Sequence, residues 1–178
     1  MVQWMYRQTR MKYLGNYKKW IDPKWIAEIL ESNGFEGKIV STSESNKNRY
    51  EEYKRAVEAG WSLDTIYWWR YTNQITSFDI KNPPWLDSNN RISWWIVKQL
   101  PGQVQPMHID VDENNNCRRF WVPLQDYSPG HILIIENKLI KDYKLGDVFE
   151  FNSALDYHGS ANIGMTPRVV ILITEHLK

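Results

Sequence analysis

The pattern of hydrophobic and polar residues divides the chain into two halves of different character. Residues 1–90 show mixed patterning that is partly helical. Apolar residues at helical spacing follow Asp22-Pro23, a pair that favours a helix start because Asp caps the first turn and Pro fits within it. This helix is expected to end at Asn33-Gly34. A second helix is predicted over 48–59, ending at Gly60.

From Arg91 onward, short apolar segments alternate with turn residues, which is typical of β-structure. Eight such segments fit a double-stranded β-helix, the two-sheet architecture also called a jelly roll. We therefore predict an α+β fold with a jelly-roll core over 91–178 and N-terminal helices from 1–90 packed on one sheet. The whole chain, 1–178, is expected to form a single domain. The predicted strands are Ser93–Leu100, Val104–Ile109, Arg118–Gln125, His131–Glu136, Lys138–Tyr143, Asp147–Phe151, Leu155–Ala161 and Arg168–Thr174.

Composition narrows the classes of partner. Hydrophobic residues make up 42% and charged residues 24% of the 178 positions, as in ordinary globular proteins. The net charge of +1 provides no strong attraction to nucleic acid or to an anionic membrane. No apolar run has the length of a membrane span, and the first residues contain no signal-peptide core. With Cys117 as the only cysteine, an internal disulfide is excluded and a cytoplasmic location is expected.

Aromatic residues are unusually frequent, with ten tryptophans and ten tyrosines. The favoured explanation for any single tryptophan is core packing, because aromatic side chains bury large areas. A groove that binds an aliphatic or flat substrate is the alternative. Trp94, Trp95 and Trp121 are the candidates for its apolar wall.

His108, Asp110 and His158 carry the strongest chemical signal. Side chains two residues apart on a strand share a face, so His108 and Asp110 can bind one ion from the end of the second predicted strand. His158 lies on the seventh, which a jelly roll can return beside the second. Two imidazoles and one carboxylate form the facial triad of non-haem Fe(II) sites. The same ligands with a water molecule could also hold Zn²⁺, and this alternative stays open.

Arg168 opens the last predicted strand, directly after the turn at 164–167. An arginine inside the core needs an anion, because it cannot lose its charge, and a carboxylate can bind it through two hydrogen bonds. The alternative is an internal ion pair with Asp or Glu. His131 and His176 are not expected to be metal ligands. His131 opens an apolar strand and His176 lies close to the C-terminus.

The segments around these residues resemble those of the Fe(II)/2-oxoglutarate-dependent oxygenases. Within that superfamily the chain is most similar to the aspartyl/asparaginyl β-hydroxylase-type domains and to the related free-proline hydroxylases. The resemblance covers residues 93–175, about half of the chain. The segments that carry it are Leu100-Pro101-Gly102-Gln103-Val104-Gln105-Pro106-Met107-His108-Ile109-Asp110, Arg119-Phe120-Trp121-Val122-Pro123-Leu124, Gly146-Asp147-Val148-Phe149-Glu150-Phe151, His158-Gly159-Ser160-Ala161-Asn162-Ile163-Gly164 and Thr166-Pro167-Arg168.

The resemblance implies that His108, Asp110 and His158 hold Fe(II) and that Arg168 binds the distal carboxylate of 2-oxoglutarate. Arg119 matches an arginine near the cosubstrate. Trp121 stands where some of these domains place a histidine beside the cosubstrate. The implied activity is an O₂-consuming hydroxylation of an aliphatic C–H, with succinate and CO₂ as coproducts. The implied substrate is an amino acid, a peptide or a protein side chain.

Other functions remain possible at the level of sequence. A cupin-like domain could use the same jelly roll and metal site to bind or sense a ligand without turnover. A nucleic-acid demethylase is not expected, because such enzymes carry a further arginine on the last strand and residues 169–178 contain none. For a free amino acid, Arg118, Lys98 or Glu150 could meet the charged groups of the substrate. A peptide would instead need an open groove, which residues 1–90 could line.

Overall fold

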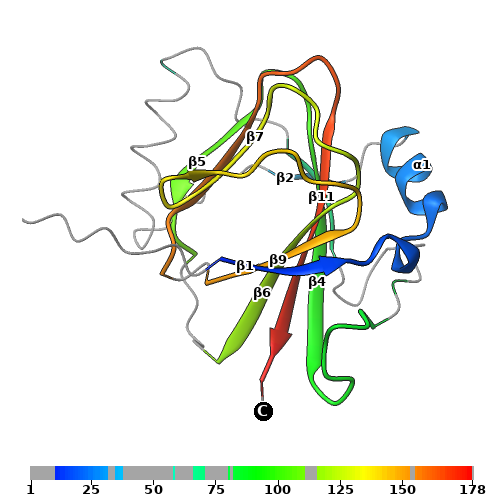
Figure 1. The fold of residues 1–178 in the computed structure, drawn as a ribbon. Helices are drawn as coiled ribbons and strands as arrows, with labels where there is room; N and C mark the ends of the chain where they lie inside the picture. Colours follow the sequence, from blue (N-terminus) through cyan, green and yellow to red (C-terminus); the bar gives the residue numbers. More distant parts are fainter. Residues whose placement is uncertain are drawn as a thin grey trace, which may run out of the picture.

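In the computed structural model, the described residues form a two-sheet sandwich with the helix α1 on its outer side (Figure 1). The structure describes residues 11–31, 35–37, 58, 66–70, 80, 82–110, 116–152 and 155–177, with only the backbone for 35–37 and 66–70. Its elements are β1 (Lys12–Asn16), η1 (Lys18–Trp20), α1 (Pro23–Glu31), β2 (Phe35–Gly37), β3 (Ile66–Arg70), β4 (Arg91–Gln99), β5 (Val104–His108), β6 (Cys117–Pro123), β7 (His131–Ile135), β8 (Lys138–Leu139), β9 (Asp147–Phe151), β10 (His158–Asn162) and β11 (Arg168–His176).

The strand order is that of a jelly roll. One sheet has the order β1-β9-β6-β11-β4-β3-β2, and the other has the order β5-β10-β7-β8. From β4 onward the chain passes back and forth between the two sheets, so that strands distant in sequence become neighbours. The pairs β4·β11, β6·β11, β6·β9, β5·β10 and β7·β10 are all antiparallel, as two interlocked Greek keys require. The predicted jelly-roll core is thus present.

All eight predicted core strands exist, with differences at their ends. The strand predicted over 138–143 contains only Lys138 and Leu139. It stops early because Asp142 has a φ of 60°, a left-handed conformation that a continuous strand does not permit. The strand predicted from Leu155 begins only at His158, the first residue of β10.

The N-terminal half differs more from expectation. The helix predicted after Asp22-Pro23 is present as α1, but it is the only α-helix with defined bounds in the described part of the chain. Three strands that the sequence pattern did not indicate, β1, β2 and β3, extend the larger sheet at both edges. The helix predicted over 48–59 lies outside the described residues except for Glu58, which is helical. Of the predicted N-terminal helical layer, the described residues show α1 alone.

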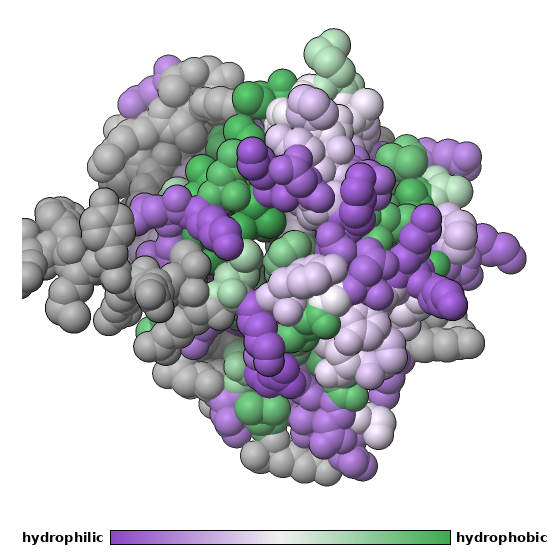
Figure 2. Space-filling model, in the orientation of Figure 1, coloured by the Kyte–Doolittle hydropathy of each residue, from purple (hydrophilic) through white to green (hydrophobic). Residues whose placement is uncertain are grey.

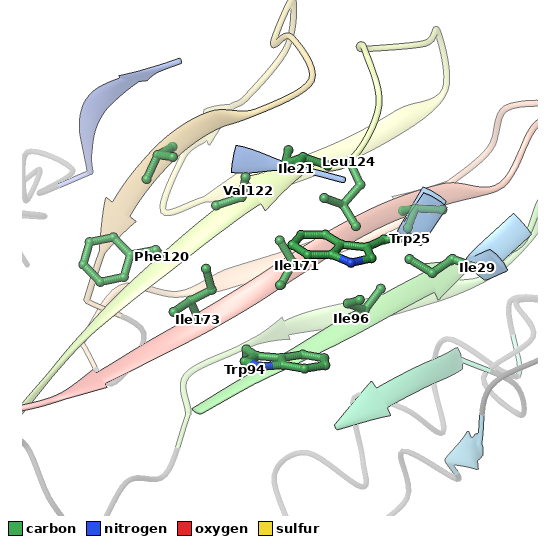
Figure 3. Close-up of a cluster of buried hydrophobic side chains, with 12 residues drawn as sticks. Ile21, Trp25, Ile29, Trp94, Ile96, Phe120, Val122, Leu124, Ile171 and Ile173 are labelled. Atoms are coloured by element: carbon green, nitrogen blue, oxygen red, sulfur yellow. The ribbon is translucent and has the colours of Figure 1, made fainter. Parts of the chain in front are cut away.

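α1 covers the outer face of the larger sheet (Figures 1 and 3). Trp25 and Ile29 of the helix pack on outward-facing residues of β4, β6 and β11, and Ile29 is fully buried. The buried Lys98 side chain caps the C-terminal end of the helix, because its Nζ donates to the carbonyls of Ile29 and Leu30 at 2.9 and 3.0 Å. A cation at a helix C-terminus also meets the negative end of the helix dipole. The outward residues of this cluster are Trp94, Ile96, Phe120, Val122, Ile171 and Ile173.

A second apolar cluster fills the space between the two sheets. Because alternate residues of a strand face opposite sides, Trp121 and Val170 point inward while their neighbours Phe120 and Ile171 point outward. Hydrophilic residues cover much of the described surface in Figure 2, with separate hydrophobic groups between them. Within the described residues, no helix is long and apolar enough to span a membrane. The candidate site is formed by polar side chains that lie beside this inner apolar cluster.

Candidate metal centre

Strand pairing brings the two histidines of the predicted triad together. His108 is the last residue of β5 and His158 is the first residue of β10, and the antiparallel register places them directly opposite each other. Their ring centroids lie 4.4 Å apart. Gly159 follows His158 at a close crossing, where an added Cβ would lie 2.9 Å from the backbone nitrogen of Met107. A glycine at this position therefore lets β10 approach β5 closely.

Asp110 completes the cluster from the segment that follows β5. Its Oδ1 lies 3.6 Å from Nε2 of His108, and its Oδ2 lies 3.8 Å from Nε2 of His158. One ligand atom from each of the three residues lies within 4.8 Å of the others. The side chain of Asp110 is 25% exposed, whereas those of His108 and His158 are 4% and 12% exposed. The cluster is thus reached from the side of Asp110.

Both histidines are held with the same ring nitrogen facing the cluster. Nδ1 of His108 lies 2.7 Å from the carbonyl oxygen of Pro106, and Nδ1 of His158 lies 3.0 Å from that of Asp156. A carbonyl only accepts hydrogen bonds, so each Nδ1 carries the proton in the neutral ring. Each Nε2 then presents a lone pair toward Asp110. Hydrogen bonds of this kind orient metal-binding histidines in proteins.

The electrostatic environment favours the metal-binding protonation states of His158 and Asp110. Burial lowers the pKa of His158 to about 4, and the neighbouring His108 acts in the same direction. Burial opposes ionisation of Asp110, but the contact with His108 and the nearby His158 and Arg119 outweigh it and hold the pKa of this carboxyl well below its usual value. At neutral pH His158 is therefore neutral and Asp110 is ionised, as metal binding requires.

Two further polar side chains contact the triad. Arg119, on the inner face of β6, donates from Nη1 to Oδ2 of Asp110 at 2.9 Å. Gln105 Nε2 lies 3.2 Å from Nε2 of His108 and can donate to its lone pair. In this structure Arg119 contacts the carboxylate of the triad, and its predicted place beside the cosubstrate stays a prediction.

Arg168 is a buried cation without a carboxylate partner among the described residues. It is 2% exposed, and its Nη1 donates to Oε1 of Gln99 at 3.2 Å. Its Nε and Nη2 have no partner in the described structure. Burial lowers the pKa of Arg168. The internal Asp or Glu partner considered from the sequence is therefore not found in this part of the chain.

Trp121 and Tyr143 lie against Arg168. The guanidinium carbon is 5.6 Å from the ring centroid of Trp121, in a cation–π arrangement. The Tyr143 ring meets that of Trp121 edge-on at 5.0 Å. Like the arginine, the Trp121 Nε1 and the Tyr143 hydroxyl are buried without a partner among the described residues. Trp121 thus lies inside the core beside the predicted anion-binding arginine.

Several residues considered for substrate contact lie elsewhere. Trp94 and Lys98 face outward from β4, toward α1, whereas Trp95 packs against the inner cluster. On the outer face, Arg118 forms an ion pair with Glu150 at 2.7 Å. The prediction that Lys98, Arg118 or Glu150 meets a bound amino acid is not supported, because strand alternation places all three on the wrong side of the sheet.

The two remaining histidines are outside the metal cluster, as expected. His131 is fully buried, and its Nε2 donates to the carbonyl oxygen of Thr166 at 3.0 Å. Burial lowers the pKa of His131, which favours the neutral ring in this position. His176 Nε2 lies 3.0 Å from the hydroxyl of Ser93. Both histidines hold strands or turns together.

Sequence reasoning missed three residues of the inner face: Gln99, Gln105 and Tyr143. Gln99 is fully buried and contacts both Arg168 and Ser160, which lies two residues beyond His158. Glutamines at inward positions of apolar strands were a usable signal, because a buried amide requires hydrogen-bond partners. Tyr143 gave no such signal, because it follows β8 in a segment whose path only the folded chain defines.

No family model matches the chain, and no curated protein matches it in sequence.

Comparison with solved structures finds partial similarity to cupin-fold proteins. A Cupin 2 conserved barrel domain protein from Salinispora arenicola is 14% identical over 66% of this chain and 82% of its own, with a TM-score of 0.39. The cupin domain of Schizosaccharomyces pombe Cnp3 is 11% identical over 63% and 65%, with a TM-score of 0.41. KdgF from Halomonas sp. is 14% identical over 64% and 80%, with a TM-score of 0.41. At these low scores, the fold assignment rests on the strand order itself.

Proposed function

We propose that this protein is an Fe(II)- and 2-oxoglutarate-dependent dioxygenase that hydroxylates an aliphatic C–H of an amino acid, peptide or protein side chain. His108, Asp110 and His158 would hold the metal, as two neutral imidazoles and a carboxylate do in facial-triad sites. The chemistry the metal supplies when bound is activation of O₂, coupled to oxidative decarboxylation of 2-oxoglutarate to succinate and CO₂.

One combination of features carries the proposal. A preorganised triad and a buried arginine with no carboxylate partner among the described residues lie inside the same jelly roll. A metal alone would not explain Arg168, because a buried guanidinium needs an anion. A cosubstrate with a metal-binding end and a distal carboxylate accounts for both groups. The β10 strand links them, because it begins at His158 and its Ser160 contacts Gln99, the partner of Arg168.

The protein side chains have separable roles in this proposal. Pro106 and Asp156 orient the two imidazoles through their carbonyl groups. Arg119 holds the Asp110 carboxylate and helps to keep it ionised. The inner apolar cluster excludes water around Arg168, which strengthens its attraction for a carboxylate.

The substrate class is supported less directly, by the resemblance to amino-acid and side-chain hydroxylases and by the partial exposure of Asp110. The outer-face charges Arg118, Glu150 and Lys98 bind within the protein, so they cannot provide the recognition of a free amino acid. Succinate release measured with a panel of amino acids, and then with peptides, would distinguish the two kinds of substrate.

The proposed function is tested by anaerobic titration of the protein with Fe(II) and 2-oxoglutarate. Chelation of Fe(II) by 2-oxoglutarate should produce a weak charge-transfer band in the visible spectrum, and O₂ should then give succinate. His108→Ala should abolish both signals. Absence of the band in the wild-type protein, with binding of Fe(II) verified by metal analysis, would contradict the proposal.

The same experiment separates the alternatives. A cupin-like binding or sensing domain would bind metal and ligand but release no succinate, with any substrate. A zinc protein would retain Zn²⁺ through purification and would give no band after exchange to Fe(II). Decay of 2-oxoglutarate that depends on His158 would exclude both alternatives.

A further inference from the structure

An irregularity in strand β5 turns one more polar side chain toward the metal centre. His158 of β10 pairs with His108 of β5, and Ser160 pairs with Gln105, so two steps along β10 match three along β5. The extra residue in β5 is a β-bulge, a feature that re-aims side chains next to functional sites. Because of this bulge, Gln105 and His108 lie on the same face of β5, whereas regular alternation would place them on opposite faces.

The amide of Gln105 reaches the metal-facing side of the His108 ring. Its Nε2 lies 3.2 Å from Nε2 of His108. Because Nδ1 of the same ring donates to the carbonyl oxygen of Pro106 at 2.7 Å, Nε2 carries the lone pair and accepts from the amide. This lone pair also faces Asp110. In the orientation seen in the structure, the Gln105 amide and a metal ion would therefore compete for one lone pair.

A half-turn of the amide removes this competition. Rotation about the Cγ–Cδ bond exchanges Oε1 and Nε2, two atoms of nearly the same size, and moves no other atom of the side chain. Oε1 of Gln105 would then take the position 3.2 Å from Nε2 of His108. Two atoms that present lone pairs at this distance repel each other, unless both bind the same cation. The rotated amide is therefore stable beside His108 only when an ion is bound.

The distance suits two ligands of one ion. Ligand atoms on neighbouring positions of an octahedral ion lie roughly 3 Å apart, because each is about 2.1 Å from the metal. Oδ1 of Asp110, a member of the triad, lies 3.6 Å from Nε2 of His108, whereas the Gln105 amide lies 3.2 Å from it. The amide is thus as well placed as a predicted ligand.

The chemistry of an amide oxygen also suits this centre. Carbonyl oxygens of side-chain amides are ligands of hard divalent cations such as Mn²⁺ and Mg²⁺. The triad contributes one negative charge, that of Asp110, and the Arg119 guanidinium donates to the same carboxylate at 2.9 Å. A neutral amide adds an oxygen dipole to the centre without adding a charge.

We propose that Gln105 is a fourth ligand of the metal centre, which binds the ion through Oε1 after its amide turns away from donation to His108. The inference rests on the metal site of the proposed function, but not on its oxidation chemistry. It adds a metal-binding residue to the set of His108, Asp110 and His158. Because a neutral amide oxygen binds more weakly than a carboxylate, a chelating cosubstrate can still displace it.

The test measures binding of Mn(II) to the full chain without any organic ligand. Gln105→Ala removes the ligand atom, and affinity for Mn(II) should fall by about tenfold or more, as when a supporting group of a metal site is lost. Gln105→Asn keeps an amide that is too short, and it should lose affinity to a similar extent. Gln105→Glu keeps an oxygen at the same reach, so affinity should equal or exceed that of the wild type.

Met107→Leu is the control on the same strand. The Met107 side chain packs beside Gly159, on the outer face of the smaller sheet, and the two residue types have similar volumes. Affinity for Mn(II) should stay unchanged in this variant. A loss of affinity equal to that of Gln105→Ala would show that β5 is sensitive to any change of side chain, and it would overturn the proposal.

The sign of the effect separates ligation from simple competition. If Gln105 only donates to His108, its removal frees the lone pair, and Gln105→Ala should bind Mn(II) more tightly than the wild type. A rise in affinity, or no change, would overturn the proposal.

A count of bound water gives a second readout that a merely structural role would not move. Water enriched in ¹⁷O broadens the electron paramagnetic resonance lines of Mn(II) in proportion to the number of water molecules that it binds. Gln105→Ala should bind one more water molecule than the wild type, because water takes the place of the amide oxygen. Gln105→Glu should bind the same number as the wild type. Equal counts in Gln105→Ala and the wild type would contradict ligation by Gln105.

The remaining outcomes distinguish the inference from the proposed function. If Mn(II) binding depends on Gln105 but Fe(II) and 2-oxoglutarate give no charge-transfer band, the fourth ligand stands and the oxygenase proposal falls. A band and succinate release, together with full metal affinity in Gln105→Ala, would overturn the inference alone. Failure of the wild-type protein to bind any divalent metal would overturn both.

Discussion

The charged side chains on the two faces of the larger sheet differ in how fully they are paired within the protein. On the outer face, Arg118 binds Glu150 and Glu175, and Lys98 binds two carbonyls of α1. On the inner face, Arg168 has two nitrogen atoms without partners among the described residues, and two imidazole lone pairs face one carboxylate. The charged side chains of the outer face are paired with other groups of the chain, and these contacts stabilise the fold. The polar groups of the inner face include donors and lone pairs that a ligand could bind.

This difference between the two faces arises on the same strands, because inner and outer side chains share one backbone. The inner and outer residues alternate along β4, β6 and β11, so neighbours in sequence take part in different tasks. Arg118 and Arg119 are the clearest example. The first joins two glutamates outside the sheet, and the second holds Asp110 inside it. Chemical type alone would not distinguish them, whereas the face of β6 on which each side chain lies does.

The largest expected effect comes from removing a member of the triad. His158→Ala should weaken binding of Fe(II) more than 100-fold, because loss of second-shell partners alone costs roughly 10–100-fold at metal sites. Metal content after dialysis and succinate release would both report the loss. His176→Ala, which removes a histidine outside the cluster, should retain full metal content. Equal metal binding by both variants would show that the inner histidines have no such role.

The second effect tests whether the unpartnered charge of Arg168 is what binds the ligand. Gln99→Glu has nearly the same shape and would place a carboxylate beside the guanidinium, at the position of the 3.2 Å hydrogen bond. Arg168 would then have an internal partner, as the outer-face arginine has. Affinity for 2-oxoglutarate should fall by at least about 30-fold, or about 2 kcal/mol. Calorimetric titration measures this change.

Gln103→Glu is the matched control for that variant. Gln103 is also buried, but its Oε1 accepts from the backbone nitrogen of Leu100 and it has no hydrogen bond with Arg168. Its replacement should leave affinity for 2-oxoglutarate within about twofold, because the added carboxylate would not lie at the hydrogen bond to Arg168. A comparable loss of affinity in both variants would mean that added negative charge, and not pairing with Arg168, weakens binding.

A smaller effect is expected on the outer face, and on stability alone. Lys98→Met keeps most of the side chain's length but removes the donor to the carbonyls of Ile29 and Leu30. The free energy of unfolding should fall by about 1–3 kcal/mol, the cost of leaving buried acceptors unsatisfied. Urea denaturation would measure it. Affinity for Fe(II) and 2-oxoglutarate should not change. A loss of affinity without a loss of stability would contradict the assignment of Lys98 to a purely structural role.

The smallest effect is expected at the outer ion pair. Arg118→Gln should reduce stability by less than about 1 kcal/mol at pH 7, because the arginine side chain is 36% exposed. Arg118 lowers the pKa of Glu150 in the folded protein. A carboxyl with a lowered pKa contributes stability above its unfolded pKa and loses it as the pH falls. The difference between variant and wild type should therefore shrink as the pH falls from 7 to about 3.

Much of the core was predictable because its signals are local. Alternation between apolar and polar residues located the eight strands, and β9 was predicted with the bounds that it has in the structure. The start of α1 followed from Asp22-Pro23, whose aspartate Oδ1 accepts from the backbone nitrogen of Lys24. The strands β1, β2 and β3 were missed because the short segments that form them have no clear alternation. Their pairing with β9 and β4 provides the stabilisation that the segments lack.

The candidate site was only partly predictable for a related reason. The spacing of His108 and Asp110 predicted that both lie on one side of the chain, although β5 ends at His108 and Asp110 follows it. Arg168 was marked as a charge at the start of an apolar strand. Tyr143 could not be found in this way, because it comes from an irregular segment that meets β6 only in the folded protein.

The sequence by itself determined which residues alternate between the faces of each strand, and which of them can bind a metal or an anion. These properties depend on residue type and on a period of two, both of which are local. Only the tertiary structure decided that His158 pairs with His108, that Arg168 has no carboxylate partner among the described residues, and that Tyr143 lies beside it. Such pairings join segments far apart in the chain. They depend on which strands pair and on how the two sheets stack, which no single segment encodes.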